Sequence, residues 1–235
     1  MLVLALDTAT PAVTAGVVRL DDAVTTLAQR VTVDARAHGE LLVPHIQDVL
    51  ADAGLALSAL DAIVCGAGPG PFTGLRVGMV TAAALGHARD IPVYPVVTLD
   101  AIAADAIAAD AVAETDADAG PLLVATDARR REVYWARYLG GPDGRRTDGP
   151  HVEKPAALAE KLPGLGVRRV AGQGGVMYAE VLGLPVVRPE FPSPAGLVTA
   201  GAEALRAGEP PAPLTPLYLR RPDAVELAHP KKVLR

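Results

Sequence analysis

The residues best suited to chemistry near the start of this chain are one carboxylate and the hydroxyls that follow it. Asp7 closes the apolar run of residues 2–6, and Thr8 and Thr10 come next in a short turn. A carboxylate placed there can hold a metal-bound water while neighbouring hydroxyls contact phosphate, an arrangement suited to nucleotide binding. The same Asp can instead accept hydrogen bonds from its own turn. The spacing favours the turn role and leaves nucleotide binding by Asp7 and Thr8 as the alternative.

A glycine-rich segment offers a second part of such a site. The sequence Gly-Gln-Gly-Gly at residues 172–175 lies between an expected strand and an expected helix. Glycines there let the backbone lie close to a nucleotide base, although glycine-rich turns are also ordinary strand-to-helix connections. We assign Gly172, Gly174 and Gly175 to the nucleotide-binding alternative and keep the plain turn beside it.

Histidine and carboxylate side chains gather near one expected helix, at His38, Glu40 and His45. Both side-chain types are usual metal ligands, but two histidines seven residues apart on a helix are separated by about 10.5 Å along its axis, too far to share one ion. The chain has one cysteine, Cys65, so an internal disulfide is excluded. Cys65 lies in an apolar run, and no neighbouring cation in the sequence would activate its thiol. We predict that these histidines hold no metal ion and that Cys65 is a packing residue rather than a nucleophile.

The segment of residues 66–76, Gly-Ala-Gly-Pro-Gly-Pro-Phe-Thr-Gly-Leu-Arg, joins an expected strand to an expected helix. Backbone amides at such a junction can hold an anion. The segment lacks the Gly-Lys-Ser/Thr of a phosphate loop, and Pro71 stands where a dinucleotide fingerprint needs glycine. A rigid connector is therefore the favoured interpretation.

Three consecutive arginines, Arg129, Arg130 and Arg131, lie between two expected strands. They can contact RNA phosphate or an acidic partner, but arginines in a turn are usually only solvated. The net charge of −5 also argues against a broad nucleic-acid surface. A solvated turn is the favoured interpretation, with direct RNA binding as the alternative.

The composition bounds the class of protein. Half of the 235 residues are apolar, 21% are charged and 3% are aromatic, so the chain can bury an aliphatic core in one large domain or two small ones. A single cysteine is typical of a cytoplasmic protein. No basic leader precedes the first strand and no run of about 18 apolar residues occurs, so we expect neither export nor a membrane span.

The elements that must position these residues follow from apolar periodicity. The first half predicts an antiparallel meander followed by strand-helix units, and Asp127 follows an apolar strand in the second half as Asp7 does in the first, which suggests a duplication. The expected strands are residues 2–6, 13–19, 24–33, 62–66, 92–97, 122–126, 133–138 and 169–172. The expected helices are residues 42–53, 72–89, 98–112 with Thr98 as cap, 155–162, 176–182, and one capped by Ser193.

Three of these helices differ in how they are expected to pack. Residues 42–53 carry one apolar stripe, and residues 72–89 repeat Gly74, Gly78, Ala82 and Gly86 every four positions, a ridge that lets another backbone approach closely. Helical glycines lose about 1 kcal/mol each relative to Ala, so a neighbour must use that ridge. The neighbour can belong to this chain or to a partner. The Ala-rich near repeat at 101–110 predicts a solvated helix.

Several segments together resemble the TsaB (YeaZ) family, subunits of the bacterial machinery that makes threonylcarbamoyladenosine in tRNA. They are residues 4–10, 38–42, 68–78, 127–129 with 132–134, and 216–220, of which Gly-Pro-Gly-Pro-Phe-Thr-Gly-Leu-Arg is the most specific. The resemblance spans nearly the whole chain. It implies an α/β fold like that of actin, sugar kinases and heat-shock ATPases, with two lobes that contain duplicated ribonuclease-H-like cores.

With this resemblance we divide the chain into three parts. Residues 1–112 are expected to form the first lobe with partner-binding helices, and residues 120–192 the second lobe. An acidic linker at 114–120 joins them. Residues 193–235 are expected to form a C-terminal helix and tail that pack back on the lobes.

The resemblance also implies a partner, the TsaD-type catalytic paralogue, paired through the helices at 42–53 and 72–89. The expected interface residues are Leu42, Ile46, Val49, Leu50, Gly74, Val77, Gly78, Thr81, Ala82 and Leu85. A TsaE-type ATPase and tRNA are expected to act through the complex, without a membrane. We expect a homodimer when the paralogue is absent.

The resemblance finally implies that this subunit is not catalytic. The paralogue's metal-binding histidines align with Thr98 and Ile102, and neither residue can replace imidazole. We therefore expect no intrinsic cofactor, with ATP or ADP and metal on partner subunits. The expected function is to activate threonylcarbamoyl transfer to the adenosine beside the anticodon. The alternative is a small-molecule phosphotransferase or ATPase with Asp7 on magnesium.

Overall fold

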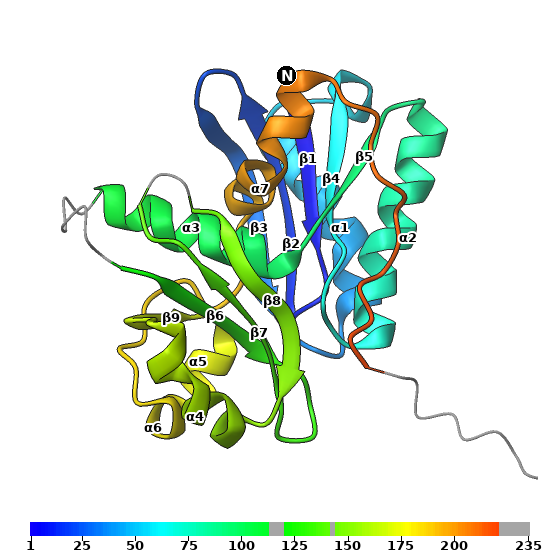
Figure 1. Ribbon diagram of the computed structural model, residues 1–235. Coiled ribbons are helices and arrows are strands. Elements are labelled where there is room, and N and C mark those ends of the chain that lie inside the picture. Colours follow the sequence, from blue (N-terminus) through cyan, green and yellow to red (C-terminus); the bar gives the residue numbers. More distant parts are fainter. Residues whose placement is uncertain (113–119, 142–143, 221–235) are drawn as a thin grey trace, which may run out of the picture.

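Two β-sheets flanked by helices form two lobes (Figure 1). The computed structural model describes residues 1–112, 120–141 and 144–220. The first sheet has the strand order β3-β2-β1-β4-β5, and the second has the order β8-β7-β6-β9. The strands are β1 (Leu2–Asp7), β2 (Ala12–Leu20), β3 (Val24–Val33), β4 (Ala62–Gly66), β5 (Val93–Val96), β6 (Leu122–Asp127), β7 (Val133–Tyr138), β8 (Arg146–Glu153) and β9 (Arg169–Ala171).

The helices cover the faces of both sheets. They are α1 (His38–Asp52), α2 (Phe72–Arg89), α3 (Thr98–Val112), α4 (Pro155–Leu165), α5 (Gln173–Met177), α6 (Ala179–Leu182) and α7 (Pro194–Ala207), with a 3-10 turn at Leu57–Ala59. None of the helices in the described part of the chain is long and apolar enough to cross a lipid bilayer.

The two sheets repeat one topology. In each, the first strand pairs antiparallel with the second and parallel with the fourth, as β1 does with β2 and β4, and β6 with β7 and β9. The turn after each first strand also has the same hydrogen bond. The Ala9 amide donates to Asp7 Oδ1 at 2.8 Å, and the Arg129 amide donates to Asp127 Oδ1 at 2.9 Å. The predicted α/β fold, with two lobes that repeat one core topology, is confirmed.

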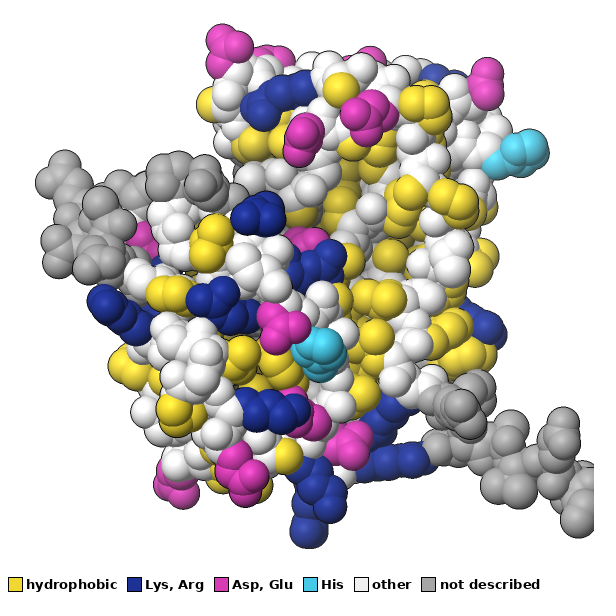
Figure 2. Space-filling view, viewed as in Figure 1, with side chains coloured by type: hydrophobic (Ala, Val, Ile, Leu, Met, Phe, Trp, Pro, Cys, Tyr) yellow, Lys and Arg dark blue, Asp and Glu magenta, His cyan; other side chains and the backbone are white. Residues whose placement is uncertain are grey.

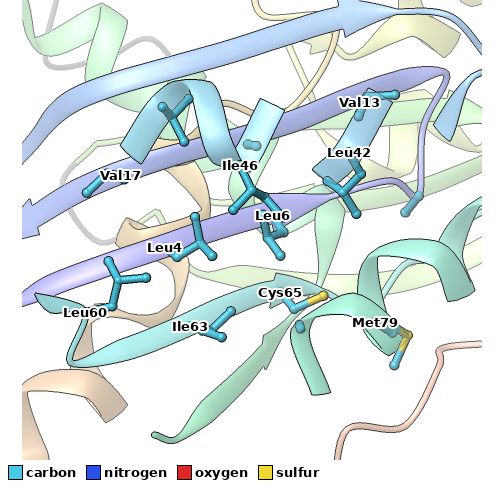
Figure 3. Close-up of a cluster of buried hydrophobic side chains, with 14 of the residues drawn as sticks. Leu4, Leu6, Val13, Val17, Leu42, Ile46, Leu60, Ile63, Cys65 and Met79 are labelled. Carbon is cyan, nitrogen blue, oxygen red and sulfur yellow. The ribbon is translucent and has the colours of Figure 1, made fainter. Parts of the chain in front are cut away.

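The first lobe has an apolar core on each face of its sheet. Alternate residues of β1 supply both: Leu4 and Leu6 face α1 and α2, whereas Val3 and Ala5 face α7. Figure 3 shows the first of these clusters, in which Leu42 and Ile46 of α1 reach down onto the strands. Because both faces of β1 are covered, its sequence is an unbroken apolar run rather than an alternating one.

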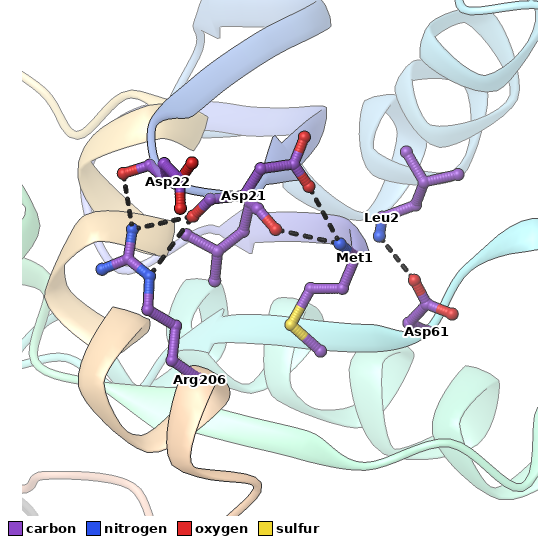
Figure 4. Close-up of polar contacts among 7 residues, drawn as sticks. Met1, Leu2, Asp21, Asp22, Asp61 and Arg206 are labelled. Atoms are coloured by element: carbon purple, nitrogen blue, oxygen red, sulfur yellow. Dashed lines mark hydrogen bonds and ion pairs between the residues drawn. The ribbon is translucent and has the colours of Figure 1, made fainter.

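Helix α7 returns the chain to the first lobe. Ser193 caps it, because the Ser193 hydroxyl accepts from the Gly196 amide at 3.0 Å and donates to Asp105 Oδ1 at 2.6 Å. At the other end, the Arg206 guanidinium donates to the carbonyl oxygens of Asp21 and Asp22 in the β2–β3 turn (Figure 4). The C-terminal helix is thus the third layer of the first lobe.

Helix α3 lies between the lobes rather than in solvent. Ile102, Ala103 and Ala106 are buried and pack against the second sheet, and the other side of α3 packs against α7. The prediction of a solvated Ala-rich helix is therefore wrong. Small Ala side chains let α3 approach both neighbours closely, and a helix covered on two sides needs no polar face there.

The other differences from the expected elements are local. Strand β8 was not expected, because its sequence, Arg-Thr-Asp-Gly-Pro-His-Val-Glu, is polar and contains Gly and Pro, which an edge strand tolerates. The helix expected at 176–182 is two short helices that meet at Tyr178. The expected linker at 114–120 lies, apart from Gly120, outside the described residues, as does the tail after residue 220.

Candidate functional site

The Asp7 carboxylate is enclosed at the C-terminal end of β1. Its side chain has 0% exposure. Oδ1 accepts a hydrogen bond from the Ala9 amide at 2.8 Å, and Oδ2 accepts one from the Thr98 hydroxyl at 2.6 Å. Gly66 closes another side, since a Cβ there would lie 1.8 Å from Oδ2. Asp7 is thus held by its own turn and by the start of α3, where Thr98 had been expected to cap the helix.

Burial raises the pKa of Asp7 to about 6, because enclosure removes the water that stabilises the charged form. Hydrogen bonds from Thr98 and Ala9, and the nearby His38, act in the opposite direction. A carboxylate enclosed in this way cannot contact a ligand. In this structure Asp7 therefore offers no exposed surface to a nucleotide, and its nucleotide-binding role stays a prediction.

The Thr8 hydroxyl is used inside the chain as well. It donates to the Gly74 carbonyl oxygen at 2.7 Å and accepts from the Gly78 amide at 2.9 Å. The Gly74 carbonyl and the Gly78 amide are the i and i+4 partners of one helical hydrogen bond of α2, so the Thr8 hydroxyl bridges them. With 1% of its surface exposed, Thr8 makes both of these hydrogen bonds within the chain, and its nucleotide-binding role also stays a prediction.

The glycines at 172–175 serve close packing. A Cβ at Gly172 would lie 2.2 Å from the Ala125 carbonyl oxygen, and one at Gly174 would lie 2.9 Å from the Ala125 carbonyl carbon. Gly175 lies against the Val170 side chain in the same way. Only Gly172 forms the turn between β9 and α5, whereas Gly174 and Gly175 lie within α5. Their close contacts with Ala125 and Val170 give all three glycines a packing role, and their nucleotide-binding role stays a prediction.

The histidines and the cysteine have structural contacts. His38 Nε2 lies 2.8 Å from the Thr10 carbonyl oxygen, and His45 Nε2 lies 2.9 Å from the Thr32 hydroxyl. Burial raises the pKa of the Cys65 thiol, which keeps it protonated and unreactive. In the ranges that the structure describes, no group of three or more His, Cys, Asp or Glu side chains is placed to hold a metal ion.

The predicted partner-interface residues need correction, because most of them lie in the core of the first lobe. The buried ones are Leu42, Ile46, Val49, Leu50, Gly74, Gly78 and Ala82. A Cβ at Gly78 would lie 2.6 Å from the Thr8 hydroxyl, and one at Gly86 would lie 2.3 Å from Val93 Cγ2. The small-residue ridge of α2 therefore receives neighbours from this chain, not from another one.

Both helices nevertheless leave apolar side chains on their outer side. Val80 is 65% exposed, Val43 50% and Phe72 47%. Three of the predicted residues, Val77, Thr81 and Leu85, are half-buried on α2. We call these six residues the α1/α2 face. Val43, Phe72 and Val80 were missed because the apolar stripe of each helix marks the side that faces the core.

The end of the described chain crosses from the first lobe to the second. The Leu217 amide donates to the Ala67 carbonyl oxygen at 2.8 Å, and the Tyr218 ring stacks on Phe72 with centroids 5.2 Å apart. Arg220 then pairs with Glu132 after the β6–β7 turn. Sequence patterns gave no role to Tyr218, since its contacts are made with residues more than 140 positions away.

Comparison with known proteins agrees with this architecture. The family model of TsaD, tRNA N6-adenosine threonylcarbamoyltransferase, matches residues 26–205. Protein Rv3421c of Mycobacterium tuberculosis is 55% identical over 226 residues, which cover 96% of this chain and 95% of the relative.

Two further relatives carry the family's names. The tRNA threonylcarbamoyladenosine biosynthesis protein TsaB of Escherichia coli is 33% identical over 164 residues, which cover 69% of this chain and 66% of that protein. The structure of YeaZ from Pseudomonas aeruginosa is 28% identical with a TM-score of 0.73, and the match covers 93% of this chain and 99% of that one. A Pseudomonas aeruginosa structure described as similar to peptidase YEAZ gives 30% identity and a TM-score of 0.72, with 99% of its chain covered. The duplicated fold and these matches together show that the chain belongs to the TsaB (YeaZ) family.

Proposed function

We propose that this chain is a non-catalytic subunit of the machinery that makes threonylcarbamoyladenosine in tRNA. It pairs with the TsaD-type paralogue, which transfers the threonylcarbamoyl group to the adenosine beside the anticodon. The family supports the link to this modification, because the E. coli relative is named as a protein of its biosynthesis. ATP or ADP and metal belong to partner subunits, and a TsaE-type ATPase acts through the complex.

The enclosed Asp7 carries the non-catalytic part of the proposal. A phosphotransferase or ATPase needs a carboxylate that reaches a metal ion or its bound water. The Asp7 carboxylate instead accepts hydrogen bonds from Ala9 and Thr98 and has no exposed surface. This geometry argues against the alternative enzyme function.

Two core positions support the same conclusion. Thr98 and Ile102, which align with the paralogue's metal-binding histidines, are both fully buried. Thr98 donates to Asp7, and Ile102 packs in the cluster that α3 makes with the second sheet. Neither side chain can replace an imidazole ligand, which supports placing the chemistry on the paralogue.

The α1/α2 face is the surface that we assign to pairing. It leaves Val43, Phe72 and Val80 exposed on two helices that pack against each other. A second helix pair with an apolar face would remove these side chains from water, which favours association. The same face predicts a homodimer when the paralogue is absent.

The test is reconstitution with the TsaD-type protein of the same genome. We expect the chain alone neither to hydrolyse ATP nor to modify tRNA, and we expect modification to require both proteins when threonylcarbamoyl adenylate is supplied. The Asp7→Asn variant should support modification as the unaltered chain does. Metal-dependent ATP turnover by the chain alone, lost in Asp7→Ala, would instead support the phosphotransferase.

A further inference from the structure

An arginine-rich cleft runs between the two lobes and borders the α1/α2 face, with which it shares Phe72 and Val77. It consists of two cavities of about 390 Å³ and 280 Å³. Pro71 and Arg129 line both cavities, so the two form one continuous cleft. We call it the Arg129 cleft. Arg36 and Thr73 line one end, and Arg130 and Tyr218 line the other.

The backbone of the β6–β7 turn holds its three arginines in an unusual conformation. Arg129, Arg130 and Arg131 have φ angles of 61°, 54° and 61°. Left-handed backbone costs a residue with a side chain roughly 1 kcal/mol, and such residues cluster at functional sites. All three side chains are exposed. Glycine or Asn adopts this conformation at a lower cost than arginine does.

Aromatic rings stand beside these arginines. Phe72 and Tyr218 stack with their ring planes 23° apart, and the Arg76 guanidinium lies 3.5 Å from the Phe72 centroid. The Arg76 Nε–H also donates to the Tyr218 hydroxyl at 2.8 Å, which fixes the tyrosine ring. Tyr218 remains 40% exposed and Phe72 47%. The result is a preformed ladder of flat groups at the mouth of the cleft.

The charge of the cleft is positive although the chain carries −5 overall. Its described lining includes Arg36, Arg129, Arg130 and Arg220 and no Asp or Glu. Two neighbouring carboxylates pair with arginines of the lining: Asp127 lies 3.8 Å from Arg129 Nε, and Glu132 pairs with Arg220. Arg36 lines the other end of the cleft. In Figure 2, Lys and Arg side chains gather at the end of the second lobe that carries the β6–β7 turn, next to the end of the described chain.

We propose that the Arg129 cleft binds a single-stranded segment of RNA, with phosphates on the arginines and a base stacked on Tyr218. Arginine beside an exposed aromatic ladder is the combination that recognises unpaired nucleotides, because the cation holds the phosphate and the ring takes the base. An acidic peptide would use the arginines but not the stacked rings. The extension of the cleft on both sides of Arg129 suits several nucleotides rather than one. This inference rests on the proposed function, which supplies tRNA as the RNA.

The test uses the full chain, alone and in complex with the paralogue. The probes are a fluorescein-labelled transcript of a tRNA that reads an ANN codon, its anticodon stem-loop, and a fully paired RNA duplex of equal length. The first variant changes Arg129, Arg130 and Arg131 together to Asn, which tolerates left-handed backbone. Its matched control changes three exposed basic residues elsewhere, Arg19, Arg145 and Lys154, to Asn.

We expect the triple-arginine variant to bind the tRNA at least tenfold more weakly, with a salt dependence reduced by about two to three phosphate contacts, and the control to bind within twofold of the unaltered chain. Tyr218→Ala should weaken binding by about fivefold or more, whereas Tyr218→Phe should retain most of it because the ring stays. The duplex should compete poorly.

Unchanged RNA affinity in the triple-arginine variant would overturn the inference. If the triple-arginine variant lost only ATP binding, the cleft would be a mononucleotide site and the inference would fail. If the duplex competed as well as the stem-loop, the binding would be charge attraction alone, and the inference would fail too. Circular dichroism checks folding, and if the triple variant is unfolded, Tyr218→Ala against Tyr218→Phe decides. If the chain does not pair with the paralogue, the proposed function fails, but RNA binding by the chain alone still tests the cleft.

Discussion

The Thr8 hydroxyl lies 2.9 Å from the Gly78 amide nitrogen, so a side chain from the β1–β2 turn completes the hydrogen bonding of α2. The same hydroxyl donates to Gly74, one turn earlier in the helix. Glycine at 74 and 78 lowers helix propensity by about 1 kcal/mol at each position, and the turn that fits against them offsets this loss. The glycine ridge is thus part of how the first lobe folds.

The first prediction concerns this contact. Gly78→Ala should destabilise the chain by about 2 kcal/mol, because the new Cβ would lie 2.6 Å from the Thr8 hydroxyl. The double variant Gly78→Ala/Thr8→Ala removes the clash. Its loss of unfolding free energy should therefore be about 1 kcal/mol smaller than the sum of the losses in the two single variants. Urea unfolding followed by circular dichroism measures each value.

Ala83→Gly, at an exposed position of the same helix, serves as the control for propensity alone. It should lose about 1 kcal/mol and show no coupling with Thr8→Ala. Helix propensity alone would instead make Gly78→Ala stabilise the chain by about 1 kcal/mol. That result would show that the contact between Thr8 and Gly78 does not contribute to stability.

The second prediction is a pH dependence from Asp7. Its pKa is about 6 in the folded chain against an ordinary value of 3.8, so the folded chain binds this proton more tightly than the unfolded chain does. The stability that this gives is complete below about pH 4 and is lost as the pH rises through 6. Asp7→Asn has no such dependence. Its stability relative to the unaltered chain should therefore rise between pH 4 and 7, by at most about 3 kcal/mol.

Thermal melting of both proteins across this pH range, at constant ionic strength, checks the prediction. Asn can keep the bond from the Ala9 amide and donate to the Thr98 hydroxyl, so the fold should survive the change. A difference between the two proteins that stays constant from pH 4 to 7 would contradict a raised pKa at Asp7.

The third prediction concerns the α1/α2 face. Val80→Asp should weaken pairing with the TsaD-type paralogue at least tenfold, because an unpaired carboxylate would enter an apolar interface. Since Val80 is 65% exposed, the free chain should melt within a few degrees of the unaltered one. Val186→Asp, a change of the same kind at a 41% exposed position of the second lobe, is the control. Calorimetric titration measures both, and equal effects of the two variants would argue for another interface.

The fourth prediction concerns the pair of Asp110 and Arg169, which ties α3 to β9. The carboxylate accepts from both Arg169 terminal nitrogens, and Arg169 is 7% exposed. Asp110→Ala should destabilise the chain by about 3 kcal/mol, because it leaves a buried guanidinium unpaired. Asp110→Ala/Arg169→Leu should recover most of that loss in a chemical-denaturation experiment. A double variant no more stable than Asp110→Ala would show that Arg169 is not penalised by burial.

Local sequence determined most of the elements and the repeated turns. The apolar runs before Asp7 and Asp127 predicted the first strand of each sheet, and both turns close with the same Asp hydrogen bond. Ser193 before Pro194 predicted the start of α7. These features depend on neighbours within a few residues, so composition and periodicity are enough to find them.

Only the tertiary structure decided which partner each face receives. The ridge of Gly74 and Gly78 left packing within the chain and packing against another chain open, and the position of Thr8 decided it. The sequence predicted that α3 lies in solvent, but the second sheet and α7 cover it. Tyr218 has a visible role only in the folded chain, where its ring stacks on Phe72. Periodicity tells which side of an element is apolar, but burial and hydrogen bonding depend on segments far away in the sequence, and these are fixed only when the whole chain packs.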